Sequence, residues 1–256
     1  MVTANAVVVG GATGIGAGLC RALAQDGYGC DIVDFDVEHA EALGAELGAA
    51  VWPADITRRA VMQATADAIV ARRGTIDLLF ANAGAIVLKP FLDASEEDWR
   101  WLTEVNIAGT VNTIHAFLPY LLAQPCASRI VITCSVSVLR TAGIAGQSLY
   151  VATKAAQLGL FTALERELHG TNVSPAIVFP GPVRTELRAK SARAHAGAID
   201  GGCLPPGAMP AGMIDGAVAG RRILDAVLAR QRFIATHKEE RDAVAARLGA
   251  IVAAFD

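Results

Sequence analysis

A valine run that leads directly into a glycine-rich segment constrains this chain more than any other feature. The stretch from Val7 to Gly18, VVVGGATGIGAG, holds five glycines behind its β-branched residues. Ordering glycine costs conformational entropy, so a chain places it where the backbone needs unusual dihedral angles or a close approach. Two interpretations follow: a simple turn between a strand and a helix, or a loop that brings bare backbone amides close to a phosphate.

The spacing of these glycines separates several kinds of phosphate-binding loop. A P-loop requires Lys and then Ser or Thr after Gly-x-x-x-x-Gly, but Ala17 and Gly18 stand at those positions. The Gly-x-Gly-x-x-Gly pattern is not matched either. The pattern in this chain is Gly10-x-x-x-Gly14-x-Gly16. It still predicts a tight turn at the N-terminus of a helix, whose amides favour an anionic group.

An acidic residue follows at the distance expected for a ribose ligand. Asp34 ends the second predicted strand, eighteen residues after Gly16, and a carboxylate about 20 residues beyond such a loop holds the adenosine ribose of a dinucleotide. It accepts hydrogen bonds from both ribose hydroxyls and repels a 2′-phosphate. No Arg or Lys stands beside the loop or directly after Asp34, so the sequence predicts NAD in preference to NADP. The alternative, an aspartate that only caps the next helix, fits Asp36 better.

Short β-branched runs alternate with longer helical patterns along the chain. The predicted strands are Ala6–Val9, Cys30–Val33, Ala50–Pro53, Leu78–Ala81, Arg129–Cys134, Ser174–Phe179 and Phe233–Thr236. The predicted helices lie near 15–26, 37–47, 58–72, 96–122, 149–169, 215–230 and 239–254. This alternation predicts an α/β fold with a doubly wound parallel sheet, in a single domain over residues 1–256.

A Gly/Pro-rich stretch interrupts the alternation after the sixth predicted strand. It runs from Pro180 to Gly212 and contains PGPVRTE and GGCLPPGAMPAG. A long irregular segment inside a compact domain is usually either functional or disordered. Because it follows the carboxyl end of a strand, where open α/β sheets bind ligands, we expect residues 186–212 to form a flap over a site.

Composition supports a buried sheet and excludes other classes. The 256 residues are 53% apolar and 18% charged with a formal net charge of -3, which provides no basic surface for nucleic acid. The mean hydropathy of +0.41 is high, but no apolar run reaches the roughly 18 residues of a membrane span, and a sheet covered on both faces explains the value. We expect no signal peptide, no metal site, and five reduced cysteines in a cytoplasmic protein.

A second constellation of functional residues lies at the head of the helix predicted near 149–169. The segment YVATK places Tyr150 and Lys154 at i and i+4, so both project from one helix face. An ammonium close to a phenol favours phenolate and lowers its pKa from about 10, and an oxidised nicotinamide would add a second positive charge. Such a pair often occurs by chance. Here, however, ANAG, EVNIAG, CSVS and PGPVRT accompany it in one order at consistent intervals.

With these motifs the sequence resembles the short-chain dehydrogenase/reductase family over essentially its whole length. The resemblance implies a Rossmann-type fold and hydride transfer between nicotinamide and a secondary alcohol or ketone. Tyr150 then acts as acid/base, and Lys154 lowers its pKa and binds the nicotinamide ribose. The serine that holds the substrate oxygen usually lies thirteen residues before the tyrosine, which selects Ser137, whereas Ser135 requires an insertion. Asn106 matches an asparagine whose backbone anchors a relay water.

The resemblance also implies where the dinucleotide binds. Asp55 contacts the adenine ring with Ile56 beside it, and Asn82 to Gly84 end the fourth strand below the adenosine. The complete implied set is Gly10, Thr13, Gly14, Ile15, Gly16, Asp34, Phe35, Asp55, Ile56, Asn82, Ala83, Gly84, Tyr150, Lys154, Pro180, Gly181, Val183 and Thr185.

Two positions depart from the family pattern. Val9 stands in place of a threonine and Ala81 in place of the first of two asparagines. Together they remove one hydrogen-bonded tie between neighbouring strands, so we expect lower local rigidity there. The four implied catalytic side chains are intact.

The expected substrate region is mostly apolar. Its candidate lining residues include Leu139, Arg140, Ile144, Gln147, Leu187, Leu204 and Met209. They favour an apolar or cyclic alcohol or ketone, with a polyol or sugar dehydrogenase as an alternative in the same family. A non-catalytic NAD-binding redox sensor is the alternative from another class, but such a protein would be expected to lose Tyr150 or Lys154. An epimerase of the extended branch needs a longer C-terminal region.

The two longest predicted helices are also candidates for assembly. In the family, the helices equivalent to 96–122 and 149–169 pair across a two-fold axis, so we expect a homotetramer or homodimer. Ser95 and Asp98 predict a capping box at the start of the first. The segment 239–254 predicts an amphipathic helix, and its apolar stripe extends to Phe255. The stripe consists of Val244, Leu248, Ile251 and Phe255.

Overall fold

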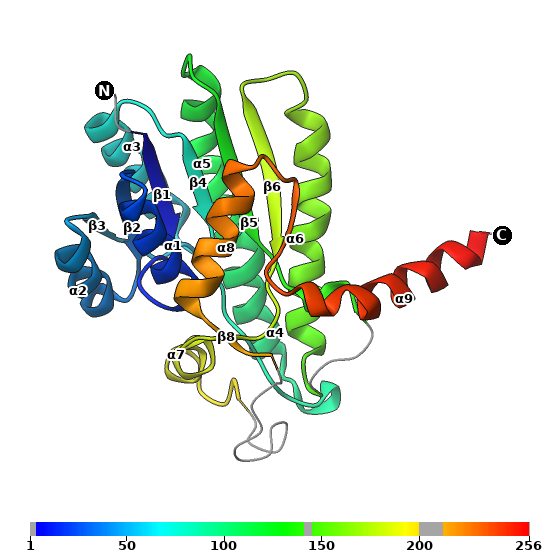
Figure 1. Ribbon diagram of the computed structural model, residues 1–256. Helices are drawn as coiled ribbons and strands as arrows, with labels where there is room; N and C mark the ends of the chain where they lie inside the picture. Colours follow the sequence, from blue (N-terminus) through cyan, green and yellow to red (C-terminus); the bar gives the residue numbers. More distant parts are fainter. Residues whose placement is uncertain (1–3, 141–144, 200–211, 256) are drawn as a thin grey trace.

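Seven parallel strands form the centre of the molecule (Figure 1). The computed structural model describes residues 4–140, 145–199 and 212–255. The strands are β1 (Asn5–Val9), β2 (Gly29–Asp34), β3 (Ala50–Pro53), β4 (Leu78–Ala81), β5 (Ser128–Thr133), β6 (Val173–Phe179) and β9 (Phe233–Ala235). They lie in the order β3-β2-β1-β4-β5-β6-β9, and each neighbouring pair is parallel. The predicted fold class is confirmed, and each predicted strand lies within one residue of the observed one.

Helices cover both faces of this sheet. On one face lie α1 (Gly14–Gln25), α2 (Val37–Leu47) and α8 (Gly216–Leu228), and on the other lie α3 (Arg59–Arg73), α5 (Gly109–Ala123) and α6 (Ser148–Glu167). Successive strand residues point to opposite faces, so Val7 and Val9 enter one core and Val8 the other. Burial on both faces explains why the strands need no polar alternation.

The helix predicted over 96–122 is divided by a wider turn. It consists of α4 (Glu96–Thr103), a π-helical turn (Glu104–Ala108) and α5. Such a turn holds one extra residue and redirects the following side chains, and it often marks a functional position. The capping box is confirmed: Asp98 N donates to Ser95 Oγ at 3.1 Å, and Ser95 N donates to the Asp98 carboxylate at 2.8 Å.

The predicted flap contains a regular helix. Residues Leu187–Ala194 form α7, and the short strands β7 (Val183–Arg184) and β8 (Ile214–Asp215) pair beside it. The prediction of irregular structure is wrong for α7. Its eight residues, LRAKSARA, contain no glycine or proline, but the segments on either side are rich in both and made the whole stretch look irregular. Residues 200–211 of the flap lie outside the described part of the chain.

The last helix, α9 (Arg241–Val252), extends away from the body (Figure 1). Short 3-10 turns precede and follow it. Val244 packs against the core, whereas Leu248, Ile251 and Phe255 are exposed, so most of the predicted apolar stripe is uncovered within the described chain. None of the described helices combines the length and hydropathy that a membrane span requires.

Glycines allow α1 and α8 to pack at backbone contact. A Cβ atom at Gly220 would overlap the backbone of Gly18, and one at Gly18 would overlap the Gly216 carbonyl oxygen. This contact places α8 directly beside the helix that starts at the glycine-rich turn (Figure 1). It therefore supports the position of that turn.

We expect Gly220→Ala to lower the free energy of unfolding by about 1–3 kcal/mol, because the added methyl group overpacks the contact. Gly159→Ala is the matched control: Gly159 is an exposed residue inside α6 with no atom within 4 Å of an added Cβ. It should stabilise the protein by up to about 1 kcal/mol. Urea unfolding measures both, and equal gains in the two variants would contradict the close packing.

Candidate active site

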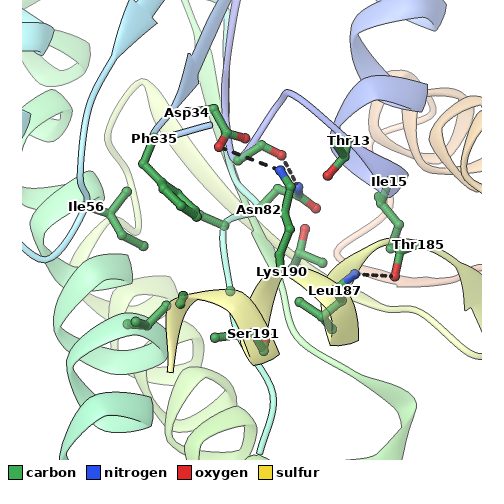
Figure 2. Close-up of a pocket in the computed structure, with 18 of the residues that line it drawn as sticks. Thr13, Ile15, Asp34, Phe35, Ile56, Asn82, Thr185, Leu187, Lys190 and Ser191 are labelled. Carbon is green, nitrogen blue, oxygen red and sulfur yellow. Dashed lines mark hydrogen bonds and ion pairs between the residues drawn. The ribbon is translucent and has the colours of Figure 1, made fainter. Parts of the chain in front are cut away.

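A cavity of about 460 Å³ lies at the carboxyl ends of the strands. Its lining includes Asp34 at the end of β2, Asn82 after β4, Cys134 after β5 and Pro180 after β6. The strand order reverses between β1 and β4, and open α/β sheets bind ligands at such a switch point. Figure 2 shows the side chains of this cavity.

The glycine-rich turn forms one wall of the cavity. Gly10 has a φ of +80°, and a Cβ atom there would lie 2.5 Å from the Ala83 backbone. A Cβ atom at Gly16 would overlap the Gly10 carbonyl oxygen. Helix α1 begins at Gly14, and the side chain of its N-cap, Thr13, makes no capping hydrogen bond. The first amides of this helix, which have no intrahelical acceptor, therefore suit an anion.

Asn82 joins the two halves of the sheet at this point. Its backbone N donates to Val9 O at 3.0 Å, and its side-chain Nδ2 donates to Gly10 O at 2.8 Å. Val9 and Ala81 themselves are buried and paired in register. Asn82 therefore links β4 to the end of β1, while the side chains of Val9 and Ala81 have no polar group for a tie of their own. The lower local rigidity stays a prediction.

Asp34, the last residue of β2, lies beside the glycine-rich turn. Its side chain is buried, with Oδ2 accepting from Ala12 N at 2.9 Å and Oδ1 accepting from Asp36 N at 3.0 Å. The carboxylate therefore holds the turn against β2 while it faces the cavity (Figure 2). Asp36 caps α2 by accepting from His39 N, as expected for the neighbouring residue.

Tyr150 and Lys154 both face the cavity from the first turns of α6. Lys154 is only 4% exposed, and its Nζ donates to Thr133 O at 2.9 Å and to Gln157 Oε1 at 3.0 Å. The same nitrogen lies 5.8 Å from the centre of the Tyr150 ring. A Cβ atom added to Gly84, which lines the cavity, would lie 3.3 Å from this nitrogen, so the ammonium lies at the floor of the cavity.

Burial controls the pKa values of this pair. It raises the pKa of Tyr150 to about 12, and the interaction with the Ser135 hydroxyl lowers it by less. Burial also lowers the pKa of Lys154 to about 8. Within the protein itself, the loss of solvation thus keeps the pKa of Tyr150 above its ordinary value. The expectation also included the positive charge of an oxidised nicotinamide, and that combined effect stays a prediction.

Ser135 rather than Ser137 interacts with the tyrosine, and neither serine is among the residues that line the cavity. Ser135 is the group whose hydroxyl acts on the pKa of Tyr150. Ser137 lies behind it: its Oγ is 2.8 Å from Ser135 Oγ and its backbone N donates to that atom at 3.2 Å. The spacing rule selects Ser137, and in the structure the short 3-10 turn Val136–Val138 places the Ser137 hydroxyl against Ser135 Oγ.

Asn106 is completely buried in the π-helical turn and does not face the cavity. Its Oδ1 accepts from Ala85 N at 2.7 Å and its Nδ2 donates to Thr153 Oγ1 at 2.9 Å. Its carbonyl oxygen already accepts from Gln157 Nε2 and Thr110 Oγ1, both at 2.8 Å. The relay water that the resemblance implied at this carbonyl is thus not supported, because two protein donors occupy both lone pairs.

Helix α7, which lies inside the predicted flap 186–212, closes the cavity from that side, and Leu187 lines it as expected. Lys190, Ser191 and Ala194 also line the wall. Ile86 N donates to Ser191 Oγ at 3.0 Å, and His195 Nε2 lies 2.7 Å from Asp98 Oδ1. No local motif marks Lys190 as a site residue.

Most of the predicted cofactor residues line this one cavity. They are Gly10, Thr13, Gly14, Ile15, Asp34, Phe35, Asp55, Ile56, Asn82, Ala83, Gly84, Tyr150, Lys154, Pro180 and Thr185. Gly16, Gly181 and Val183 are not among the lining residues. Gly181 N instead donates to Thr236 Oγ1 at 3.2 Å.

The predicted substrate residues are less well grouped. Leu139, Arg140 and Gln147 do not line the cavity, and Arg140 pairs with Glu240 at 2.8 Å. Ile144, Leu204 and Met209 lie outside the described residues. Within the described ranges, no cluster of His, Cys, Asp and Glu side chains is arranged to hold a metal ion.

Known proteins share both the sequence and this architecture. A family model described as short chain dehydrogenase matches residues 4–196. An uncharacterized oxidoreductase of Listeria innocua is 31% identical over 188 residues, which are 71% of this chain and 75% of that protein. The 1-deoxy-11-beta-hydroxypentalenate dehydrogenase of Streptomyces exfoliatus is 34% identical over 192 residues, 72% of this chain and 69% of that protein.

A solved structure extends the similarity to nearly the whole fold. The short chain dehydrogenase/reductase of Burkholderia phymatum in complex with NAD superposes with a TM-score of 0.85 at 26% identity, over 97% of this chain and 94% of that one. The sheet and its cavity define an α/β oxidoreductase that binds a nucleotide cofactor. The chain belongs to the short-chain dehydrogenase/reductase family.

We expect the stability of the protein to rise with pH above about 8, relative to Lys154→Met. The folded protein releases the Lys154 proton near its pKa of about 8, whereas an unfolded lysine retains it to about 10.4. In this window the unfolded chain binds more protons, so the free energy of unfolding increases with pH, by up to about 3 kcal/mol. Urea unfolding between about pH 7.5 and 10 tests this; parallel curves for the two proteins would contradict the lowered pKa.

Proposed function

We propose that this protein is an NAD(H)-dependent oxidoreductase that interconverts a secondary alcohol and a ketone, with Tyr150 as the acid/base. One observation carries the proposal: the glycine-rich turn with Asp34 and the Tyr150–Lys154 pair line the same cavity. A site that held a nucleotide without turnover would not need a buried lysine beside a buried phenol. The alternative of a redox sensor is therefore disfavoured.

The residues at the adenosine end fit a dinucleotide. A Cβ atom at Gly10 or Gly16 would overlap neighbouring backbone, so the turn can keep this shape only with glycine at both positions. In this shape its backbone can lie close to a pyrophosphate. Asp34 retains lone pairs for ribose hydroxyls after it binds Ala12 N and Asp36 N. Asp55, Ile56 and Phe35 provide the lining for an adenine ring. The preference for NAD rests on the negative charge of Asp34, and the related structure with NAD bound is consistent with it.

The chemistry at the other end needs only a few groups of this chain. When bound, the nicotinamide ring exchanges the hydride and, in its oxidised form, brings a positive charge near the phenol. In alcohol oxidation Tyr150 would have to be ionised, which the positive charge of the oxidised cofactor favours. Its phenolate Oη would then take the proton of the substrate hydroxyl while the carbinol carbon gives up its hydride. Ser135 Oγ donates a hydrogen bond to the substrate oxygen and steadies it as charge develops. Lys154, held by Thr133 O and Gln157, provides a fixed cation below the tyrosine.

The lining around the reacting end favours an apolar substrate. Ala85, Trp101, Val105 and Leu187 contribute to this wall of the cavity, and the substrate of choice is an apolar or cyclic alcohol or ketone. The relative named as a dehydrogenase of a hydroxypentalenate is consistent with this class. Arg140 is engaged by Glu240 and is not offered to a substrate carboxylate.

We also propose that the protein assembles as a homotetramer or homodimer in a reducing, cytoplasmic environment. Exposed apolar residues on α5 and α9, among them Val111, Leu122 and Ile251, support assembly. Cys20, Cys30, Cys126 and Cys134 are free thiols, which supports the compartment, and Cys203 lies outside the described residues.

Tyr150→Phe should lower kcat/KM by at least about 100-fold, because it removes the acid/base while it keeps the ring. A panel of secondary alcohols and ketones with NAD(H) and NADP(H), followed by the nicotinamide absorbance near ~340 nm, measures turnover. NADH affinity, measured by fluorescence titration, should stay nearly unchanged.

Tyr120→Phe is the matched control for this experiment. Tyr120 lies on α5, where its hydroxyl donates to Asp67 at 2.6 Å on the exterior of the protein. The control should retain full activity. Retained turnover in Tyr150→Phe would exclude the assigned role, and failure of the wild-type protein to bind NADH or NADPH would exclude the function itself.

Ser135→Ala and Ser137→Ala separate the two serine assignments. We expect the loss at Ser135 to reduce kcat by about 100–1000-fold, as for other donors to a developing oxyanion. Ser137→Ala should cost less than about 10-fold, because Ser137 reaches the site only through Ser135. Steady-state kinetics on the best substrate of the panel measures both. The reverse order would restore the serine that the spacing rule selected.

A further inference from the structure

A lysine from the flap helix lies at the adenosine end of the cavity. Lys190 of α7 points across the cavity toward the end of β2 (Figure 2). Its Nζ is 2.9 Å from Asp36 Oδ2 and 4.0 Å from Asp34 Oδ1. The same ammonium lies 5.8 Å from the centre of the Phe35 ring. The side chain of Lys190 is only 14% exposed, so it is enclosed among the residues proposed to hold the adenosine ribose.

Helix α7 has other contacts with the body of the protein besides the Lys190 ion pair. Ser191 Oγ accepts from Ile86 N on one side of the helix axis, and His195, at the helix end, pairs with the buried carboxylate of Asp98. His195 also stacks on Trp101 with ring centres 4.8 Å apart. These contacts anchor α7 to the segments after β4 and to α4. Among the contacts of α7, the Lys190 ion pair is the one that lies beside the residues proposed to hold the adenosine ribose.

The charge at this point decides which dinucleotide is tolerated. Asp34 lines the cavity where the proposed function puts the ribose, and Asp36, two residues on, adds a second negative charge next to the cavity lining. Two carboxylates so placed would repel a 2′-phosphate. A lysine within 4.0 Å of both offsets one of these negative charges. It can also donate directly to phosphate oxygens in a charge-assisted hydrogen bond.

We propose that Lys190 is a specificity-determining residue for the dinucleotide: supplied by the flap, it moderates the repulsion by Asp34 and Asp36 and lets the site accept a 2′-phosphate alongside the preferred NAD. The proposal rests on the dinucleotide function proposed above. It adds to that function a contact between the substrate flap and the adenosine end of the cofactor. The sequence pattern around Asp34 predicted no cation at this place, since Lys190 is remote from it in the chain.

Binding of the adenosine fragments of NAD and NADP tests the proposal without turnover. The probes are 5′-AMP and 2′,5′-ADP, titrated by calorimetry, with NADH and NADPH titrated by fluorescence. Lys190→Ala should weaken 2′,5′-ADP and NADPH by about tenfold or more, the usual loss for a hydrogen bond to a charged group, and change 5′-AMP and NADH by less than about threefold. Asp36→Asn should strengthen 2′,5′-ADP, because it frees Lys190 while asparagine still caps α2.

Arg193→Ala is the matched control on the same helix. Arg193 is an exposed cation of α7 that pairs with Glu186 at 3.6 Å and does not line the cavity. It should leave all four affinities unchanged. If Lys190→Ala weakened 5′-AMP and 2′,5′-ADP equally, or weakened neither, the specificity role would be overturned while the dinucleotide function stands. A wild-type protein that binds NADH but has no measurable affinity for NADPH would have the same consequence. A wild-type protein that binds none of the probes would overturn both.

Discussion

The close approach of backbone at the switch point between β1 and β4 supports everything else in the site. Gly10 has no room for a side chain because the Ala83 backbone lies against it, and Asn82 binds the Gly10 carbonyl oxygen from the next strand. Asp34 holds the same turn from β2 through Ala12 N. Three neighbouring strands thus fix one turn, and the first amides of α1 are directed into the cavity. A looser turn would lose the wall that suits an anionic group.

A buried cation is the second constraint. Lys154 keeps its ammonium under the tyrosine because Thr133 O and Gln157 Oε1 replace part of its hydration. Gln157 in turn donates to the carbonyl oxygen of Asn106, which the π-helical turn leaves accessible. The network is rigid, but it does not by itself acidify Tyr150, whose pKa burial raises. In this family member, the charge balance of the reacting end must therefore include the cofactor's own charge.

The flap links the two ends of the cavity. Helix α7 places Leu187 against the apolar cluster that includes Tyr150, and it places Lys190 beside Asp34 and Asp36. Ser191 and His195 anchor the helix. Because one short helix reaches both regions, the proposed enclosure of substrate and the proposed recognition of cofactor would share a structural element. A substitution in α7 can thus affect either, and the two effects are separable by probes that occupy only one end.

Much of the fold and part of the site followed from local patterns in the chain. The β-branched runs, the spacing from Gly10 to Gly16, and the i, i+4 pair of Tyr150 and Lys154 are short-range features, so sequence alone determined the parallel sheet, the glycine-rich turn and the family. Only the tertiary structure decided that Ser135 faces the tyrosine, that Gln157 takes the Asn106 carbonyl, and that Lys190 meets Asp34. Each of these depends on how a turn or a distant helix is packed, and packing against remote segments leaves no signal in the local pattern of residues.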